Sequence, residues 1–291
     1  METTPIKTNE KRLADYSRRI KDGREKARKL NVVFCGLARD CSPHLYNTLS
    51  AMAHIGKLFR QWGAVVYEND SRDSTLSILR DWQSRWPRIV IKTDSLNDPK
   101  WSMARSPDRG TAMARYRNTC RNIVLEQFST TDAVIVLDLD LSRYSVNGIL
   151  HTFSFYGGFD VMASNGLRRD GAHYVQYDAW AFRKNSWEPM KFKDVKNWVY
   201  PLGSPLIPVR SAFGGLAVYQ MNAYKAAEYG GGDCEHVIFH RKLYDKGYNR
   251  VFINPSQKVI VPSLPPEALR WFSKMWRILV AMKGSSHRRN N

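Results

Sequence analysis

The sequence alternates between short, continuous apolar runs and longer stretches whose apolar residues recur at helical spacing. The apolar runs predict buried strands at 31–38, 63–68, 88–93 and 132–141. The stretches between them predict helices at 43–62, 73–86 and 111–128. This alternation predicts an α/β fold in which a mostly parallel sheet is covered by helices on both faces.

The pattern changes beyond residue 151. A short strand is predicted at 159–164, a helix at 236–247 and a further strand at 249–255. Between them, 172–232 is dense in aromatic residues, prolines and glycines, which is typical of a binding half built from loops. We expect one large domain over 31–262, with a nucleotide-binding half at 31–141 and an acceptor half at 142–262.

The chain has 45 Lys and Arg against 27 Asp and Glu, a formal net charge of +18. Each end carries a net charge of +5, over 1–30 and over 266–291. The excess indicates anionic partners: nucleotides, nucleic acid or an acidic membrane face. Hydrophobic residues make up 43% and charged residues 25% of the 291 residues, which excludes collagen, low-complexity disorder and disulfide scaffolds.

The two basic ends predict helices outside the domain. Residues 1–30 form a basic N-terminal helical extension, and 263–291 form a basic amphipathic C-terminal helix and tail. Within the latter, 266–283 sets three basic residues on one face and covers much of the rest with tryptophan and other apolar residues. Such a helix either lies on an anionic membrane surface or docks on the core with its basic face in water.

The four cysteines show neither a CxxC pair nor a zinc-site spacing, which favours buried free thiols in a reducing compartment. No apolar stretch precedes Asn31, so no signal peptide is expected. No apolar run approaches the ~20 residues of a spanning helix. The expected location is cytoplasmic, with the alternative of a peripheral membrane contact.

Asp138 and Asp140 carry the strongest chemical signal. They close the apolar run 132–141, and residues two apart in a strand point to the same side. Ligands of open α/β sheets bind at the carboxyl ends of the strands. Two carboxylates there repel each other unless one is protonated or a cation lies between them, and Mg²⁺ or Mn²⁺ bridging to substrate phosphates is the natural solution. Two solvated acids are the alternative.

A second polar cluster follows the strand 63–68. Asp73 or Ser74 can cap the next helix, but Glu68, Asn69 and Asp70 need another explanation. Their side chains crowd the carboxyl end of a strand, where they could accept hydrogen bonds from a nucleobase and a ribose.

Three further segments carry weaker signals. Arg117 lies on the helix before the two aspartates, and its guanidinium suits a diphosphate as well as a solvated basic face. Gly214 and Gly215 allow the backbone to approach a ligand closely or simply to turn. The run 233–236, Asp-Cys-Glu-His, opens a helix, where its acids are either caps or a general base and metal ligands.

In order and spacing these segments resemble GT-A nucleotide-sugar glycosyltransferases over about 31–262, and most of all transferases similar to the fungal capsule-associated mannosyltransferases. The matching segments are YENDSRDST (67–75), RN (117–118), DLD (138–140), YDAWAFR (177–183), FGG (213–215) and CEH (234–236). The resemblance implies metal-dependent transfer of a hexose or pentose from a UDP- or GDP-linked donor to an acceptor hydroxyl on a glycan or a glycolipid.

The resemblance also implies a role for each matching residue. The roles are donor binding for Glu68, Asp70, Arg117, Asp138, Gly214 and Gly215; acceptor binding for Asp178 and Trp180; Mn²⁺ or Mg²⁺ binding for Asp138, Asp140 and His236; and general base catalysis for Glu235 or Asp233. In many enzymes of this fold a histidine late in the chain binds the metal. Here the only histidine after residue 240 is His287. Either His236 substitutes, or water and phosphate complete the metal's ligands. The sequence is compatible with inversion and with retention of the configuration at the transferred sugar.

Two other functions fit parts of the sequence. A glycosyltransferase acting on hydroxylated bases of viral DNA keeps the fold and donor site and explains the charge. A non-enzymatic nucleic-acid-binding protein explains the charge but leaves the aspartate pair, the 67–75 segment and the CEH segment without a role.

Overall fold

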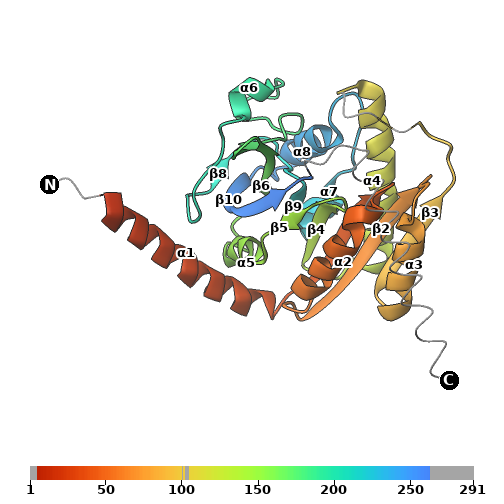
Figure 1. Cartoon of the computed structure of the whole chain (residues 1–291), viewed down its shortest axis with the longest axis horizontal. Helices are drawn as coiled ribbons and strands as arrows, with labels where there is room; N and C mark the ends of the chain where they lie inside the picture. Colours follow the sequence, from red (N-terminus) through yellow and green to blue (C-terminus); the bar gives the residue numbers. More distant parts are fainter. Residues whose placement is uncertain (1–4, 100, 102–104, 263–291) are drawn as a thin grey trace.

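The computed structural model describes residues 5–99, 101 and 105–262. Their strands form one ten-stranded sheet with the order β3-β2-β1-β4-β9-β6-β10-β5, with β7 and β8 pairing at its side (Figure 1). The strands are β1 (Asn31–Ala38), β2 (Gln61–Asn69), β3 (Ile89–Asp94), β4 (Ala133–Asp138), β5 (Arg143–Tyr144), β6 (Val161–Asp170), β7 (His173–Gln176), β8 (Ile207–Pro208), β9 (Leu216–Gln220) and β10 (Val251–Ile260).

The first half of the sheet is parallel, as the alternating pattern predicts. β1 pairs in parallel with β2 and with β4, and β2 pairs in parallel with β3. The second half is mixed, because β9 runs antiparallel to both β4 and β6, while β10 is parallel to β6. The carboxyl ends of β1, β2 and β4 therefore meet at one edge, where ligands of such sheets bind.

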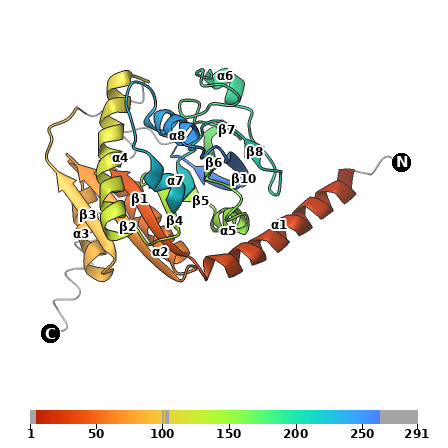
Figure 2. The same ribbon diagram turned by 180° about the vertical axis from the view of Figure 1, so that it is seen from behind.

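Helices cover both faces of the sheet (Figures 1 and 2). They are α1 (Pro5–Ala27), α2 (Ser42–Gly56), α3 (Thr75–Arg85), α4 (Pro107–Gln127), α5 (Val146–Ser154), α6 (Phe192–Val195), α7 (Met221–Ala226) and α8 (Glu235–Asp245). Alternate residues of each strand feed two separate cores: Val33 and Cys35 pack with α4 and α8, and Val32 and Phe34 pack with α2 and α3.

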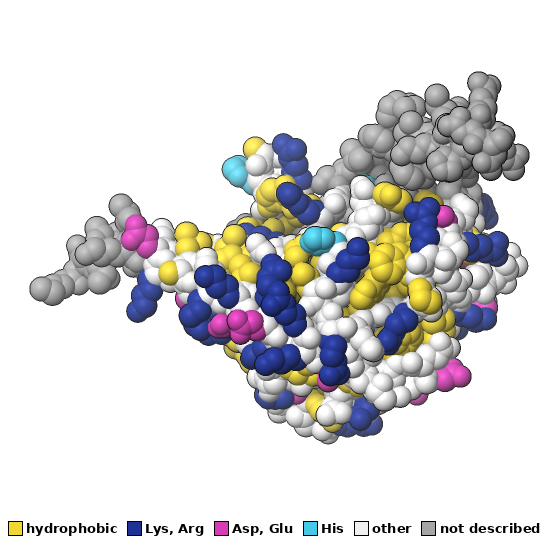
Figure 3. Space-filling model, turned by 90° about the horizontal axis from the view of Figure 1, so that it is seen from below, with side chains coloured by type: hydrophobic (Ala, Val, Ile, Leu, Met, Phe, Trp, Pro, Cys, Tyr) yellow, Lys and Arg dark blue, Asp and Glu magenta, His cyan; other side chains and the backbone are white. Residues whose placement is uncertain are grey.

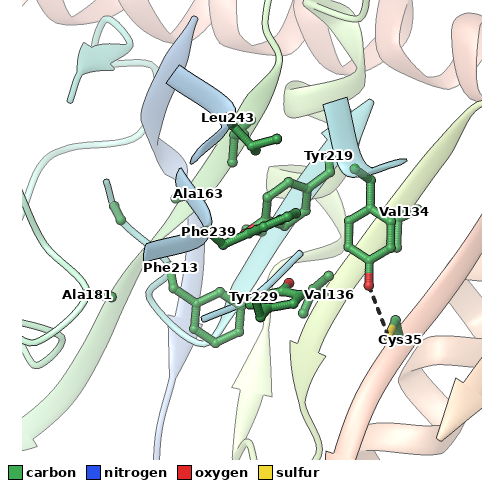
Figure 4. Packing of buried hydrophobic residues seen from close by; sticks show 14 of the residues in the cluster. Cys35, Val134, Val136, Ala163, Ala181, Phe213, Tyr219, Tyr229, Phe239 and Leu243 are labelled. Atoms are coloured by element: carbon green, nitrogen blue, oxygen red, sulfur yellow. Dashed lines mark hydrogen bonds between the residues drawn. The ribbon is translucent and has the colours of Figure 1, made fainter. Parts of the chain in front are cut away.

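The core on the α8 side is rich in aromatic rings. Tyr229 stacks on Phe239 with ring centroids 4.2 Å apart, and Tyr219 lies 5.6 Å from Phe239 (Figure 4). Such pairs stabilise a core beyond their buried area by about 0.5–1.5 kcal/mol each. This packing fixes the start of α8, where Asp233 and Glu235 lie, against the sheet.

The predicted N-terminal helix is confirmed as α1, which packs on α5 through a glycine. A Cβ atom at Gly23 would lie 1.8 Å from the carbonyl oxygen of Leu150, so the two backbones approach more closely than any other residue allows.

Figure 3 shows Lys and Arg side chains spread over the lower face of the molecule, with few acidic ones between them.

Gly23→Ala is expected to destabilise the protein by about 1–3 kcal/mol, although alanine favours a helix by about 1 kcal/mol. The added methyl group forces α1 away from α5. Urea denaturation measures the free energy of unfolding, and Ser17→Ala, on the exposed side of α1, is the matched control and should change little. A Gly23→Ala protein as stable as the original would mean that α1 does not pack as described.

The structure corrects the predicted strand 132–141. β4 ends at Asp138, and Leu139 and Asp140 lie in a turn. The reason is the neighbouring strand: β9 begins only at Leu216, and the last hydrogen bond runs from the Asp138 amide to the Gly215 carbonyl at 3.0 Å. Asp138 and Asp140 are therefore not two residues of one strand pointing to the same side.

Seven elements escaped the sequence analysis: β5, α5, β7, α6, β8, β9 and α7. β9 lies in the middle of the sheet within the stretch predicted as loops, and α5 fills the gap between β5 and β6. The cysteines are free and buried, as predicted. Among the described residues, no helix is long and apolar enough to cross a membrane. The predicted C-terminal helix lies outside the described residues.

Candidate active site

Two loops and two helices meet at the carboxyl edge of the parallel strands. The loop after β4 brings Asp138, and the loop before β9 brings Gly214 and Gly215, joined to Asp138 by the backbone hydrogen bond above. α8 brings Glu235, and α4 runs beneath with Arg117. Residues far apart in the sequence thus converge at one edge, which the predicted topology anticipates.

Arg117 links two of the predicted site carboxylates. Its Nε donates to Glu235 Oε1 at 2.8 Å, and its Nη2 donates to Asp138 Oδ1 at 3.3 Å. The guanidinium lies 5.0 Å from the centre of the Phe213 ring, and its side chain is only 8% exposed. A buried arginine needs such paired acids, since an unpaired buried charge is very costly.

Acidic groups accumulate around Asp138. Burial and, to a smaller extent, the charges of Asp140 and Glu235 together raise the pKa of Asp138 to about 7, against the lowering effect of Arg117. The carboxylate is still 32% exposed, so a ligand can reach it. A cation at this place would relieve the repulsion that raises the pKa.

Asp140 is exposed in the turn after β4, near the start of α2. Burial lowers the pKa of His44 on α2, and the negative charge of Asp140 opposes that effect. Within 5–99, 101 and 105–262, no group of three or more His, Cys, Asp or Glu residues is arranged to enclose a metal ion. A two-carboxylate site nevertheless fits Mg²⁺ or Mn²⁺, which take most other ligands from water and substrate phosphates.

Glu68 and Asp70 hold backbone at the end of β2. Glu68 is buried and accepts from the Ser71 amide at 2.9 Å. Asp70, with φ at +56°, accepts from the amides of Leu96, Asn97 and Asp98 at 2.8, 2.9 and 3.2 Å. Despite an opposing desolvation effect, hydrogen bonds from Asn69 and from these amides lower the pKa of Asp70. Asp70 thus joins the end of β2 to the loop after β3, and Glu68 holds the turn that follows β2.

The glycine pair makes a close turn under Asp178. Gly214 and Gly215 have φ of +66° and +83°, and a Cβ at Gly214 would lie 2.3 Å from the Ser164 carbonyl oxygen. The Gly214 amide donates to Asp178 Oδ2 at 2.7 Å. Burial raises the pKa of Asp178, while this hydrogen bond and another from the Ala181 amide oppose the rise.

Asp233 is held by an arginine to which the sequence analysis gave no role. Arg183 is fully buried and donates to Asp233 Oδ2 at 2.6 Å and to the carbonyls of Trp180, Phe182 and Trp187. The sequence did offer a signal for this role. Arg183 directly follows the apolar run Ala-Trp-Ala-Phe, and an arginine that is buried with such a run requires acidic or carbonyl partners. The Asp233 side chain remains 32% exposed.

A pocket of about 190 Å³ opens between these residues and α4. Trp180 and Asp233 line it together with Arg105, Pro107 and Pro189. Arg109 lies over the Trp180 ring, 4.5 Å from its centre. A larger hollow of about 330 Å³ contains Trp62 and Trp86 but lies at the amino ends of β2 and β3, at the edge of the sheet opposite the acids.

His236 is enclosed behind Glu235. Its ring stacks on Phe213 with centroids 3.8 Å apart, and its Nε2 lies 3.5 Å from Glu235 Oε1. Neither ring nitrogen has a hydrogen-bond partner among the described residues. Burial holds the pKa of His236 well below its usual value, and the charge of Arg117 adds to this, so the ring is neutral. A neutral imidazole suits a metal chemically, and that role stays a prediction.

No family model matches the sequence, and no curated protein matches it at a significant level. Its fold does resemble solved structures. The mannosyltransferase PcManGT from Pyrobaculum calidifontis, solved with GDP-Man and Mn²⁺, superposes with a TM-score of 0.51 at 14% identity, over 88% of this chain and 65% of that one. TarS 1–349 from S. aureus, solved with UDP-GlcNAc, superposes with a TM-score of 0.50 at 14% identity, over 83% of this chain and 61% of that one.

GalNAc-T7 with UDP, GalNAc and Mn²⁺ gives a TM-score of 0.51 at 12% identity, over 80% of this chain and 44% of that one. The chain thus spans less than two thirds of the length of each of these three structures. All three are glycosyltransferases, and the likeness at such low identity is one of fold. The chain has the GT-A glycosyltransferase fold.

Proposed function

We propose that the protein is a glycosyltransferase that moves a sugar from a nucleoside diphosphate to an acceptor hydroxyl. The observation that supports this most is the cluster of Asp138, Arg117 and Glu235 at the carboxyl edge of a GT-A sheet. The three neighbouring structures were solved with nucleotides or nucleotide sugars, two of them with Mn²⁺.

Asp138 and Asp140 are the proposed ligands of Mn²⁺ or Mg²⁺, with His236 as a further predicted ligand. A metal ion held by these residues would supply positive charge against the departing diphosphate. Glu68 and Asp70 would fix the loop that holds the nucleoside, and Arg117 would add positive charge on the diphosphate side. Gly214 and Gly215 would contact the donor sugar through their backbone, because the space that a Cβ atom would take at each is filled by Ser164 and by Tyr177.

Glu235 is the proposed general base of an inverting reaction, and Asp233 is the alternative. Arg117 fixes the orientation of the Glu235 carboxylate through Oε1, while Asp233 lines the pocket with Trp180. An aromatic ring beside a carboxylate suits a sugar, because the ring packs against the C–H face and the oxygens accept from hydroxyls. The pocket is therefore the proposed acceptor site, with Trp180 as its contact. Asp178, the other predicted acceptor residue, is not among the residues that line it and accepts from the Gly214 and Ala181 amides instead.

The finer assignment comes from the sequence. The six segments that resemble the fungal capsule-associated mannosyltransferase-like family support a UDP- or GDP-linked hexose or pentose as the donor and a glycan or lipid-linked glycan as the acceptor. A glycosyltransferase of hydroxylated DNA bases is the second candidate, favoured by the net charge of +18 and the basic face in Figure 3. Transfer to hydroxylated DNA but to no glycan would establish it.

A donor screen tests the proposal. UDP-, GDP- and dTDP-sugars are added with and without Mn²⁺, and the melting temperature of the protein is measured. One nucleotide sugar should raise the melting temperature, and Mn²⁺ should increase the rise, because a ligand that binds the folded state stabilises it. If no nucleotide sugar has any effect in either condition, the proposal fails.

Asp70→Ala is expected to weaken donor binding more than it slows the chemical step. The loop that Asp70 holds through three amides would contact the nucleoside equally in the ground state and in the transition state, so its loss raises KM with little change in kcat. Steady-state kinetics measures both constants, and Asp81→Ala, on the exposed part of α3, is the control. A normal KM with a collapsed kcat would contradict this role.

A further inference from the structure

Basic and aromatic side chains alternate on the surface beside the acceptor pocket. The segment 184–200 holds four lysines, four aromatic residues and two acids. We use the name basic–aromatic face for this segment together with the β6–β7 hairpin, Arg210 and Tyr244. Figures 1 and 2 both show α6 and its surrounding loops at the end of the molecule away from α3.

Pairs of a cation and a ring hold this face together. Lys184 Nζ lies 5.0 Å from the Trp198 ring centre, and the Arg168 guanidinium lies 4.9 Å from that of Phe192. Arg210 lies between two rings, 5.5 Å from Trp187 and 4.7 Å from Tyr244. The Gln176 amide donates to the Lys196 carbonyl at 2.9 Å, which joins the hairpin to the end of α6.

The face is continuous with the proposed acceptor site. Arg183, which holds Asp233, immediately precedes Lys184, and its carbonyl accepts from the amides of Arg210 and Ser211. A surface that binds this face would therefore lie beside the mouth of the pocket. Apolar groups also remain exposed there: Tyr174 is 46% exposed, and Val199 and Tyr244 are 37% exposed.

From this arrangement we infer that the basic–aromatic face docks on an anionic membrane surface, so that the acceptor sugar is presented by a lipid. Lysine and arginine attract acidic headgroups, and Trp and Tyr rings with a polar end settle at the headgroup level. A single-stranded nucleic acid fits less well, because base stacking needs a free ring face, and the rings of Trp187, Phe192 and Trp198 are each packed against the core and paired with a cation. Membrane docking by this face does not depend on the proposed function. The inference that the acceptor is carried by a lipid does depend on the proposed function.

Vesicle flotation with the full chain tests the inference. The protein should bind vesicles of phosphatidylcholine with phosphatidylglycerol and ignore vesicles of phosphatidylcholine alone. The triple variant Lys184→Glu, Lys193→Glu, Lys196→Glu should bind the acidic vesicles about a hundredfold or more weakly, given the usual contribution of each basic residue near a membrane. The matched control is Lys11→Glu, Lys21→Glu, Lys29→Glu on and after α1, which removes the same charge from exposed positions elsewhere and should change binding far less.

Equal losses in both triple variants would overturn the inference, since net charge alone would then explain the binding. Binding of the original protein to single-stranded DNA but not to acidic vesicles would overturn it too. A second variant, Tyr174→Ser with Val199→Ser, should bind at low salt but be released at lower salt than the original, because it lacks the apolar contribution that salt does not screen. An unchanged salt dependence contradicts the docking orientation. The rise in melting temperature on adding the nucleotide sugar in solution should be equal in all variants. If the sugar raised it in none of them, the result would count against the proposed function and not against membrane docking.

Discussion

Asp140→Asn is expected to reduce sugar transfer by about a hundredfold or more and to leave the stability of the fold unchanged. Asp140 is one of the two carboxylates proposed to bind the metal. Its exposed side chain lies in a turn outside the strand, so replacing it by a neutral amide removes charge without disturbing the core. Loss of metal-assisted charge stabilisation costs several kcal/mol in the transition state, which corresponds to such a factor. The rate is measured as nucleoside diphosphate released in the presence of acceptor.

The control for Asp140→Asn is Asp132→Asn, which lies before β4 at the opposite edge of the sheet and should leave turnover intact. Isothermal titration with Mn²⁺ and donor supplies a second readout, and the heat of metal binding should fall for Asp140→Asn alone. Full turnover by Asp140→Asn would remove Asp140 from the metal site. Unfolding of the variant, seen in its melting curve, would show that Asp140 holds the turn instead.

Glu235→Gln is expected to lower transfer to the acceptor by about a hundredfold or more, the usual effect of losing a general base. Glutamine keeps the shape of the side chain and can still accept from Arg117, but it cannot take the proton of the acceptor hydroxyl. Donor binding and metal binding should survive, and thermal shift with donor and Mn²⁺ measures them. The transfer rate at saturating donor and acceptor measures the chemical step.

Asp233→Asn is the informative companion, because Asp233 lines the pocket while Glu235 lies against Arg117. An inactive Asp233→Asn beside a normal Glu235→Gln would exchange their roles. If both variants transferred normally, the reaction would use no carboxylate base from this helix start. A retaining mechanism would then become the better account.

The parallel half of the sheet was predictable because burial on both faces leaves a distinctive pattern. β1 and β4 are continuous apolar runs, and each lies where the sequence analysis predicts it, apart from the last residues of β4. β9 was missed because its five residues follow a glycine turn in a region rich in loop-forming residues. Its central place depends on antiparallel pairing with β4 and β6, which no local pattern encodes.

The site was partly predictable for the same reason. Acids at strand ends were visible as DLD, but the turn that separates Asp140 from the strand depends on where β9 begins. The contact between Arg117 and Glu235 spans 118 positions of the chain and appears only after folding. The roles of Arg183 in holding Asp233 and of Asp70 in holding the loop after β3 are tertiary contacts of the same kind.

Cation-dependent cleavage of a nucleotide sugar tests the central claim most directly. The protein is incubated with the nucleotide sugar that stabilises it, with Mn²⁺ and then with excess EDTA, and the released nucleoside diphosphate is quantified beside the Asp140→Asn variant. The account predicts release by the original protein with Mn²⁺, little with EDTA and little by the variant under either condition. Equal release with Mn²⁺ and with EDTA, unchanged in the variant, would contradict it.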